Sequence, residues 1–184
     1  VAWVTSFDGQ IQKTINGGQT WVPQRSTVSS PLAGIQFISH QRGWAWGDGG
    51  VLLQSIDGGA NWFALNAADA EILDAHFLNP YTGWMLTRTG ALLRTRNGGS
   101  SWQEYDHASL DLTAINFLSK NSGYAAGMNG ALYKTTNGGE SWSAFTSFAS
   151  ATFHDLAIFD HQTGWAVGEN ALVMQLMSQE QIQK

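Results

Sequence analysis

The chain has 184 residues, of which 43% are hydrophobic and 12% are charged, and it contains 21 glycines, nine tryptophans and no cysteine. This composition is typical of a β-rich protein with many tight turns, and it excludes disordered chains, disulfide scaffolds and thiolate chemistry. The net charge of −5 offers no basic stripe for nucleic acid, and no apolar run reaches the roughly 18–20 residues of a membrane span. We therefore expect neither nucleic-acid binding nor direct membrane insertion.

Five copies of one pattern follow one another with a period of about 40 residues. We place them at residues 1–24, 32–65, 72–105, 112–145 and 152–177 of a single domain, 1–184. The third copy shows four short β-compatible segments, 72–78, 84–87, 91–95 and 101–105, separated by turn formers. One such meander cannot bury both faces, so neighbouring copies must stack, and this period is typical of a β-propeller. The sequence predicts an all-β propeller of about five four-stranded antiparallel blades, or part of a longer propeller.

The two end copies are incomplete. The first lacks its inner strand, and the last lacks its outer strand, so we expect three, four, four, four and three strands. Val1 lies inside a predicted strand, as expected of a processed chain or a fragment. Open edges invite pairing with another chain, which makes self-association a prediction. Residues 174–184 are the least repeat-like and suit either a helix or a terminal strand.

The turns between second and third segments carry glycine and asparagine. Asp8-Gly9, Gly49-Gly50 and Asn129-Gly130 suit type I′ hairpins, which require positive φ at both central residues. Asn170-Ala171 occupies the same place, and there alanine would adopt a backbone conformation that favours glycine.

A second marker is a phrase that occurs four times: TINGGQTW at 14–21, SIDGGANW at 55–62, TRNGGSSW at 95–102 and TTNGGESW at 135–142. Its Asn or Asp can accept backbone N–H bonds, its glycines supply unusual φ values, and its tryptophan can fold over the turn. Four copies are expected to be structural rather than four catalytic sites. The residues concerned are Asn16, Gly17, Gly18, Trp21, Asp57, Gly58, Gly59, Trp62, Asn97, Gly98, Gly99, Trp102, Asn137, Gly138, Gly139 and Trp142.

The phrase resembles the Asp-box, or BNR repeat, which in other families joins the third and fourth strands of a blade. Together with the Gly-Trp/Tyr-x-x-Gly segments at 43–47, 123–127 and 164–168, it resembles the photosystem II stability/assembly factor family and its bacterial relatives. The resemblance implies a non-enzymatic propeller, typically seven-bladed, without cofactor. It also implies an extracytoplasmic location (periplasm, thylakoid lumen or secreted) and, as partner, another protein such as a membrane-complex subunit.

Residues that break the repeat are the candidates for function. In a propeller, the turn after the second strand and the loop into the inner strand share one face. We predict a binding face there with Asp8, Asp48, Arg88, Asn129, Glu169 and His107, and with Asp69, Glu71, Asp111 and His154 nearby. Paired carboxylates on this face could cleave glycosides, so a sialidase- or xyloglucanase-like propeller, or a fragment of one, is the alternative. A sialidase-like site needs clustered arginines, whereas the five here do not recur at blade spacing.

The inner-strand positions Gln36, His76, Asn116 and Ala157 are expected to face a channel or a blade interface. We interpret His76 as a hydrogen-bonded scaffold residue, because the equivalent positions offer only amides and alanine to a metal. The sequence predicts no catalytic residue and no metal site.

Overall fold

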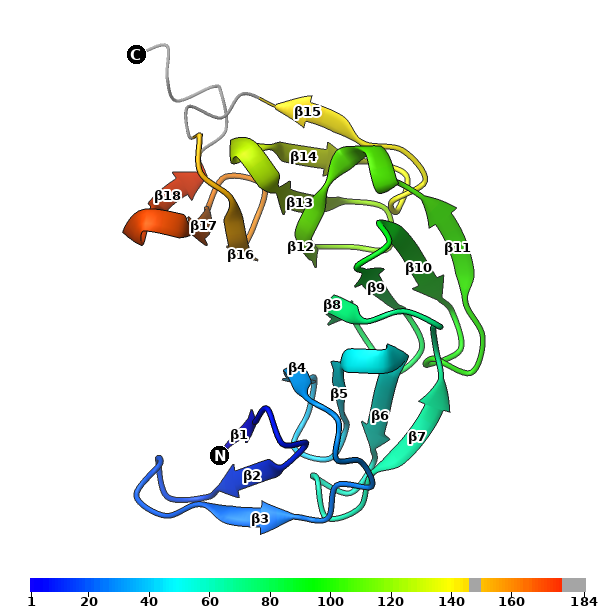
Figure 1. Cartoon of the computed structure of the whole chain (residues 1–184), viewed down its shortest axis with the longest axis vertical. Helices are drawn as coiled ribbons and strands as arrows, with labels where there is room; N and C mark the ends of the chain where they lie inside the picture. Colours follow the sequence, from blue (N-terminus) through cyan, green and yellow to red (C-terminus); the bar gives the residue numbers. More distant parts are fainter. Residues whose placement is uncertain (146–149, 177–184) are drawn as a thin grey trace. The chain divides into compact units, whose positions relative to one another are not determined.

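The computed structural model describes residues 1–145 and 150–176, and these form an all-β fold of antiparallel sheets (Figure 1). We call each sheet with its turns a blade and number the blades in chain order. Three blades have four strands, and the first and last have three in the described residues, as the sequence predicts. No helix in the described part of the chain has the length and apolar character needed to cross a membrane.

The strands follow the repeat along the chain. Blade 1 contains β1 (Ala2–Thr5), β2 (Ile11–Thr14) and β3 (Val22–Gln24), and blade 2 contains β4 (Leu32–Phe37), β5 (Gly43–Gly47), β6 (Val51–Ser55) and β7 (Phe63–Asn66). Blade 3 contains β8 (Ile72–Phe77), β9 (Gly83–Thr87), β10 (Ala91–Thr95) and β11 (Gln103–Asp106). Blade 4 contains β12 (Leu112–Phe117), β13 (Gly123–Gly127), β14 (Leu132–Thr135) and β15 (Ser143–Phe145), and blade 5 contains β16 (Phe153–Ile158), β17 (Gly164–Gly168) and β18 (Val173–Leu176). Short 3₁₀ turns lie at Asp48–Gly50, Ala108–Leu110, Met128–Gly130 and Glu169–Ala171.

The described residues pack as two compact units. The first comprises Val1–Thr89 with Leu93–Glu104, and the second comprises Gly90–Leu92 with the chain from Tyr105 onward. Blades 1 and 2 therefore lie in the first unit and blades 4 and 5 in the second, while the strands of blade 3 contribute to both.

In the core of the first unit, stacked aromatic rings join each blade to the next. The Trp3 ring of β1 stacks on Phe37 of β4 at 3.6 Å between centroids, and Trp44 of β5 stacks on Phe77 of β8 at 3.9 Å. The Gln36 carboxamide accepts from the Phe77 N–H at 2.7 Å and donates to the Phe77 carbonyl at 3.3 Å. These two bonds place Gln36 at the interface between blades 2 and 3, one of the two environments expected for the inner-strand positions.

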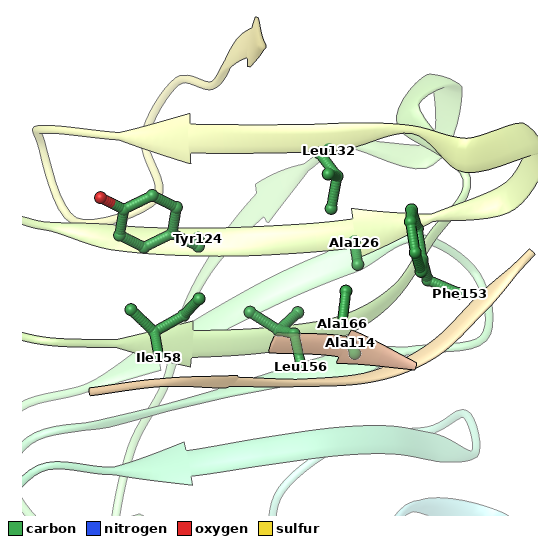
Figure 2. Close-up of a cluster of buried hydrophobic side chains, with 8 residues drawn as sticks. All are labelled: Ala114, Tyr124, Ala126, Leu132, Phe153, Leu156, Ile158 and Ala166. Carbon is green, nitrogen blue, oxygen red and sulfur yellow. The ribbon is translucent and has the colours of Figure 1, made fainter. Parts of the chain in front are cut away.

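The core of the second unit lies between blades 4 and 5. Eight buried side chains from β12, β13, β14, β16 and β17 point toward one another between the two sheets (Figure 2). The Thr113 hydroxyl adds a polar link, donating to the Phe153 carbonyl at 2.7 Å. Each large apolar side chain buried here contributes roughly 1.5–3 kcal/mol of transfer free energy. Stacking of neighbouring blades therefore supplies the burial that a single meander lacks.

The backbone confirms most of the predicted turn geometry. Gly49 and Gly50 have φ of 65° and 74°, and Asn129 and Gly130 have φ of 54° and 74°. Ala171 has a φ of 58°, in the left-handed region that L-residues other than glycine resist.

The type I′ prediction for Asp8-Gly9 is wrong. Only Gly9 has positive φ, at 79°, although the connection is as long as the one around Asn129-Gly130: Thr5 pairs with Ile11 as Ala126 pairs with Leu132. The turn is centred one residue earlier in blade 1 than in blade 4, where the Ala131 N–H donates to the Met128 carbonyl. The Gly9 N–H donates to the Ser6 carbonyl at 3.1 Å, and the Ser6 N–H donates to the Gln10 carbonyl at 3.0 Å. Phe7 and Asp8 thus occupy the centre of an ordinary turn, and Gly9 supplies the left-handed residue of a bulge.

The segment that the sequence left undecided begins as a strand. Residues 174–176 belong to β18, which pairs antiparallel with β17 as the third strand of blade 5. The remainder, 177–184, where a fifth Asp-box would fall, lies outside the described residues.

Candidate functional site

All four Asp-boxes share one hydrogen-bond pattern. The Oδ1 of Asn16, Asp57, Asn97 and Asn137 accepts from the backbone N–H four residues ahead at 2.9–3.0 Å, as the sequence predicts. The hydroxyl that opens each phrase completes the pattern. It donates to that same Oδ1 at 2.9 Å and accepts from the N–H of the second glycine at 2.8–3.0 Å. Sequence reasoning missed this role, although Thr14, Ser55, Thr95 and Thr135 recur at the repeat spacing.

The later boxes are fixed to their own blades by one further backbone bond. The first-glycine N–H donates to the loop between the first two strands: Gly58 to the Gln41 carbonyl, Gly98 to the Tyr81 carbonyl and Gly138 to the Asn121 carbonyl, at 2.7–2.8 Å. Trp62 is only 2% exposed, and its ring packs edge-on against the Phe37 ring with 5.8 Å between the ring centroids. These contacts support the architectural interpretation of the boxes.

Side chains of the preceding blade also reach the boxes. The Lys13 ammonium donates to the Gly58 carbonyl at 2.8 Å, and the Gln54 amide donates to the Gly98 carbonyl at 3.2 Å. Lys13 and Gln54 occupy equivalent repeat positions, in the strand that leads into the Asp-box. This recurrence of polar residues could have predicted their contacts with the next box, but the sequence analysis did not use it. His107, predicted on the turn face, has its ring Nε2 hydrogen-bonded to the Gly139 carbonyl at 2.7 Å. Its ring therefore contacts the fourth box.

The turns after each second strand are held against the loop that enters the same blade's inner strand. Backbone bonds of 2.9–3.1 Å run from Asp48 to Pro31, from Arg88 to Glu71, from Met128 to Asp111 and from Glu169 to Thr152. This recurrence confirms, blade by blade, that the two kinds of loop share one end of the blade. In blade 3 this bond places Arg88 beside Glu71. The negative charge of Asp48, in the equivalent turn of blade 2, also acts on Arg88.

Arg88 and Glu71 form an ion pair at this end of blade 3. The guanidinium donates through Nη2 to Glu71 Oε1 at 2.7 Å and through Nε to Oε2. This hydrogen bond lowers the pKa of Glu71 and raises that of Arg88, whose pKa is raised further by the negative charge of Asp48. The Arg88 side chain remains 65% exposed, so its charge is fixed in place yet open to a partner.

Two other predicted residues of this face, Asp8 and Glu169, have local hydrogen-bond partners. Asp8 accepts from the Ser6 hydroxyl at 2.5 Å and from the Gln10 amide at 2.8 Å, and the Ser6 hydrogen bond is the main cause of its lowered pKa. In the second unit, the Glu169 carboxylate accepts from the Thr152 N–H at 3.1 Å. Asn129 and Glu169 lie in equivalent turns of blades 4 and 5. Asp69 and His154 are exposed.

The charged side chains at these turns are held in place by hydrogen bonds, and they can bind a partner through ion pairs and hydrogen bonds. Across residues 1–145 and 150–176, no group of three or more His, Asp or Glu side chains is placed to hold a metal ion. The carboxyls with a clear pKa shift, Asp8, Asp57, Glu71 and Asp160, all have a lowered pKa because of hydrogen bonds to the charged form. Such groups remain ionised at neutral pH and accept hydrogen bonds.

Comparison with known proteins agrees with this architecture. Residues 60–147 match the family model described as "Photosynthesis system II assembly factor YCF48". The chain is an Asp-box β-propeller that resembles the photosystem II assembly factors. A curated relative, the chloroplastic photosystem II stability/assembly factor HCF136 of Oryza sativa subsp. japonica, is 33% identical over 57 residues, which cover 30% of this chain and 14% of that protein.

Two solved structures show how far the fold is shared. "YCF48 bound to D1 peptide" superposes with a TM-score of 0.72 at 19% identity, covering 94% of this chain and 58% of that one. The GH74 enzyme of Niastella koreensis gives the same TM-score at 14% identity, covering 96% of this chain and 34% of the enzyme. At these identities the likeness shows the fold alone. The chain spans a small part of the curated relative and just over half of the YCF48 structure.

Proposed function

We propose that this chain is a non-enzymatic scaffold that binds another protein, a subunit of a membrane complex, in an extracytoplasmic compartment. The match of residues 60–147 to the photosystem II assembly-factor model is the observation that carries the proposal. The rice relative is named a stability/assembly factor, and a YCF48 structure contains a D1 peptide, so the proteins this chain resembles assemble with or bind other polypeptides.

The contact surface that we propose in the first unit is the turn end of blades 1–3, with Asp8, Asp48 and Arg88. Arg88 and Glu71 both lie within the matched residues. Because Glu71 fixes the guanidinium before a partner arrives, less conformational entropy is lost when a partner carboxylate or carbonyl binds Arg88. In the second unit, Asn129 and Glu169 occupy the corresponding turns and extend the proposal to that unit.

The glycosidase alternative receives less support. A glycoside hydrolase needs one carboxyl with a raised pKa to protonate the leaving group. In the part of the chain that the structure describes, every clearly shifted carboxyl has a lowered pKa. The GH74 likeness, at 14% identity, speaks for the shared blade architecture rather than for a shared reaction.

A binding experiment with a matched pair of variants tests the proposal. The immobilised chain is incubated with detergent-solubilised membranes of its source organism, and retained proteins are identified and quantified by mass spectrometry. We expect a defined membrane-complex subunit to be retained, and we expect Arg88→Ala to reduce its retention about tenfold, the effect of losing one charge-assisted contact.

Arg96→Ala is the control, because Arg96 is an exposed arginine of the same blade that lies in the third Asp-box instead of the turn after the second strand. It should retain the subunit as the unsubstituted chain does. Failure of the unsubstituted chain to retain any membrane-complex subunit would contradict the scaffold function. Equal losses in the two variants would instead contradict the choice of face.

A further inference from the structure

Met128 lies at the surface of the second unit, at the same end of the blades as the charged turns. It is 49% exposed, and it opens the 3₁₀ turn Met128–Gly130 that joins β13 to β14. We propose that Met128 is an oxidation site of this protein, and that its conversion to the sulfoxide weakens partner binding at this turn. The effect on binding rests on the proposed scaffold function, whereas the oxidation site does not.

Met128 differs in chemistry from the residues that occupy the same place in other blades. Asp48, Arg88 and Glu169 stand at this position in blades 2, 3 and 5, and all three carry a charge. Like Met128, each of them donates its backbone N–H to the loop that enters the inner strand of its own blade. Blade 4 therefore presents an uncharged thioether where these blades present an ionised group.

The backbone fixes the position of the thioether. The Met128 N–H donates to the Asp111 carbonyl at 3.1 Å, and the Met128 carbonyl accepts from the Ala131 N–H at 3.0 Å. The turn also contacts β16 of blade 5. Segments that precede and follow the turn in the chain thus hold its backbone, while the Met128 side chain is left half exposed.

Met85 provides a comparison within the same chain. It lies in β9 of blade 3, and none of its surface is exposed. An oxidant in solution reaches the Met85 sulfur only when the structure opens, whereas the exposed Met128 is reached in the folded chain. Oxidation of the folded chain is therefore expected at Met128 well before Met85.

The oxidant is hydrogen peroxide, which transfers one oxygen atom to the sulfur. A lone pair of the Met128 sulfur attacks one peroxide oxygen, so that a sulfur–oxygen bond forms and the bond between the two oxygens breaks. The second oxygen leaves as hydroxide and takes the proton from the transferred oxygen, which gives water. The sulfur is oxidised by two electrons to the sulfoxide, and the peroxide is reduced by two electrons.

The product changes what the turn can bind. A thioether is apolar and polarizable and adapts to an apolar side chain of a partner, whereas a sulfoxide is polar. A sulfoxide oxygen buried against an apolar side chain lacks a hydrogen-bond donor, which costs free energy. The partner side chain expected at Met128 is therefore apolar, in contrast to the carboxylate or carbonyl expected at Arg88.

Peptide mapping tests the oxidation site. The folded chain is treated briefly with millimolar hydrogen peroxide, the peroxide is removed, and trypsin is added. Residues 121–134 then contain Met128 as their only methionine, and residues 43–88 contain only Met85. We expect Met128 to oxidise at least about tenfold faster than Met85 in the folded chain, and both to oxidise at similar rates in urea. Equal rates in the folded chain, or a preference for Met128 that persists in urea, would overturn the site.

Retention of the membrane-complex subunit by the immobilised chain, before and after peroxide treatment, tests the effect on binding. We expect peroxide to reduce retention about fivefold, the effect of losing one apolar contact. Met128→Leu keeps an apolar side chain that peroxide does not oxidise. Each variant is compared with its own untreated sample, and peroxide should leave the retention by Met128→Leu unchanged. Met128→Gln introduces a polar side chain and should lower retention without peroxide.

The outcomes separate this role of Met128 from the scaffold function. An untreated chain that retains no membrane-complex subunit contradicts the scaffold function and the binding role of Met128 together, and the oxidation site is then decided by peptide mapping alone. An untreated chain that retains the subunit, but loses as much retention after peroxide as Met128→Leu does, overturns the binding role of Met128 and leaves the scaffold function intact.

Discussion

The first and the third Asp-box carry almost the same sequence and make the same local hydrogen bonds, yet they stand in different surroundings. Thr14 and Thr95 each bond the second glycine of their box, at 3.0 Å and 2.9 Å. In the third box the two glycines are buried, and the turn is bonded to the loop between the first two strands. In the first box the glycines and Trp21 are exposed to solvent.

The eight-residue phrase determines the hydrogen bonds within the turn, whereas neighbouring segments determine how far the turn is buried. The hydrogen bonds inside the turn depend only on the phrase, so they form in every copy. Burial depends on the loop of the same blade and on the preceding blade, whose Leu52 and Leu65 lie beside Gly99. The same motif therefore stabilises its blade by different amounts along the chain.

The largest effect is expected for the box tryptophans. Trp62 is 2% exposed and Trp21 is 37% exposed, so Trp62→Ala should lower the free energy of unfolding by about 3–5 kcal/mol, and Trp21→Ala by about 1 kcal/mol. Urea denaturation followed by far-ultraviolet circular dichroism measures both values. Similar losses in the two variants would contradict the burial argument.

Trp62→Phe is a matched control for that measurement. The indole Nε1 of Trp62 is buried without a hydrogen-bond partner among the described residues. Phenylalanine removes this polar group and keeps most of the apolar contact with Phe37, so it should cost much less than alanine.

A smaller effect is expected for the opening hydroxyl of the box. Thr95→Val keeps the shape of the side chain but leaves the buried Gly99 N–H without its acceptor, which should cost about 2 kcal/mol. Thr14→Val should cost less than about 1 kcal/mol, because water can reach the exposed Gly18 N–H. The measurement is again urea denaturation. A larger loss from Thr14→Val would show that the two boxes differ for a reason other than solvent access.

Much of the fold could be predicted from the sequence because two markers repeat in phase. The tryptophans of the boxes and the Gly-Trp segments together placed the strands of every blade, and the strand numbers of the end blades followed from which segments were missing. The turn at Asp8 was mispredicted because strands paired with the same separation can be joined by turns centred one residue apart: on Phe7 and Asp8 in blade 1, and on Asn129 and Gly130 in blade 4.

The candidate site was less predictable than the fold. Repeat alignment brought Arg88 and Glu71 to the same end of blade 3, and the ion pair bears out that local prediction. His107 was assigned to the same end; it lies between β11 and the 3₁₀ turn Ala108–Leu110, and its ring is hydrogen-bonded to the Gly139 carbonyl of the fourth box, a contact with the next repeat that the repeat alignment does not contain. Bonds between blades, such as those of Lys13 and Gln54, depend on stacking geometry that a linear repeat does not contain.

The smallest effect concerns the one box that carries an aspartate. Hydrogen bonds from the Asn61 backbone, then from its side chain, lower the pKa of Asp57 in the folded chain. A lowered folded-state pKa gives stability that is present above the unfolded pKa, near 3.9, and is lost as the pH falls through the folded value. Asp57→Asn offers the turn the same oxygen acceptor without a titrating group. We expect the urea midpoint of the unsubstituted chain to fall more between pH 5 and pH 2 than that of Asp57→Asn, with similar midpoints at pH 7. Parallel curves would show that the charge on Asp57 adds nothing to a turn that asparagine supports in the other three boxes.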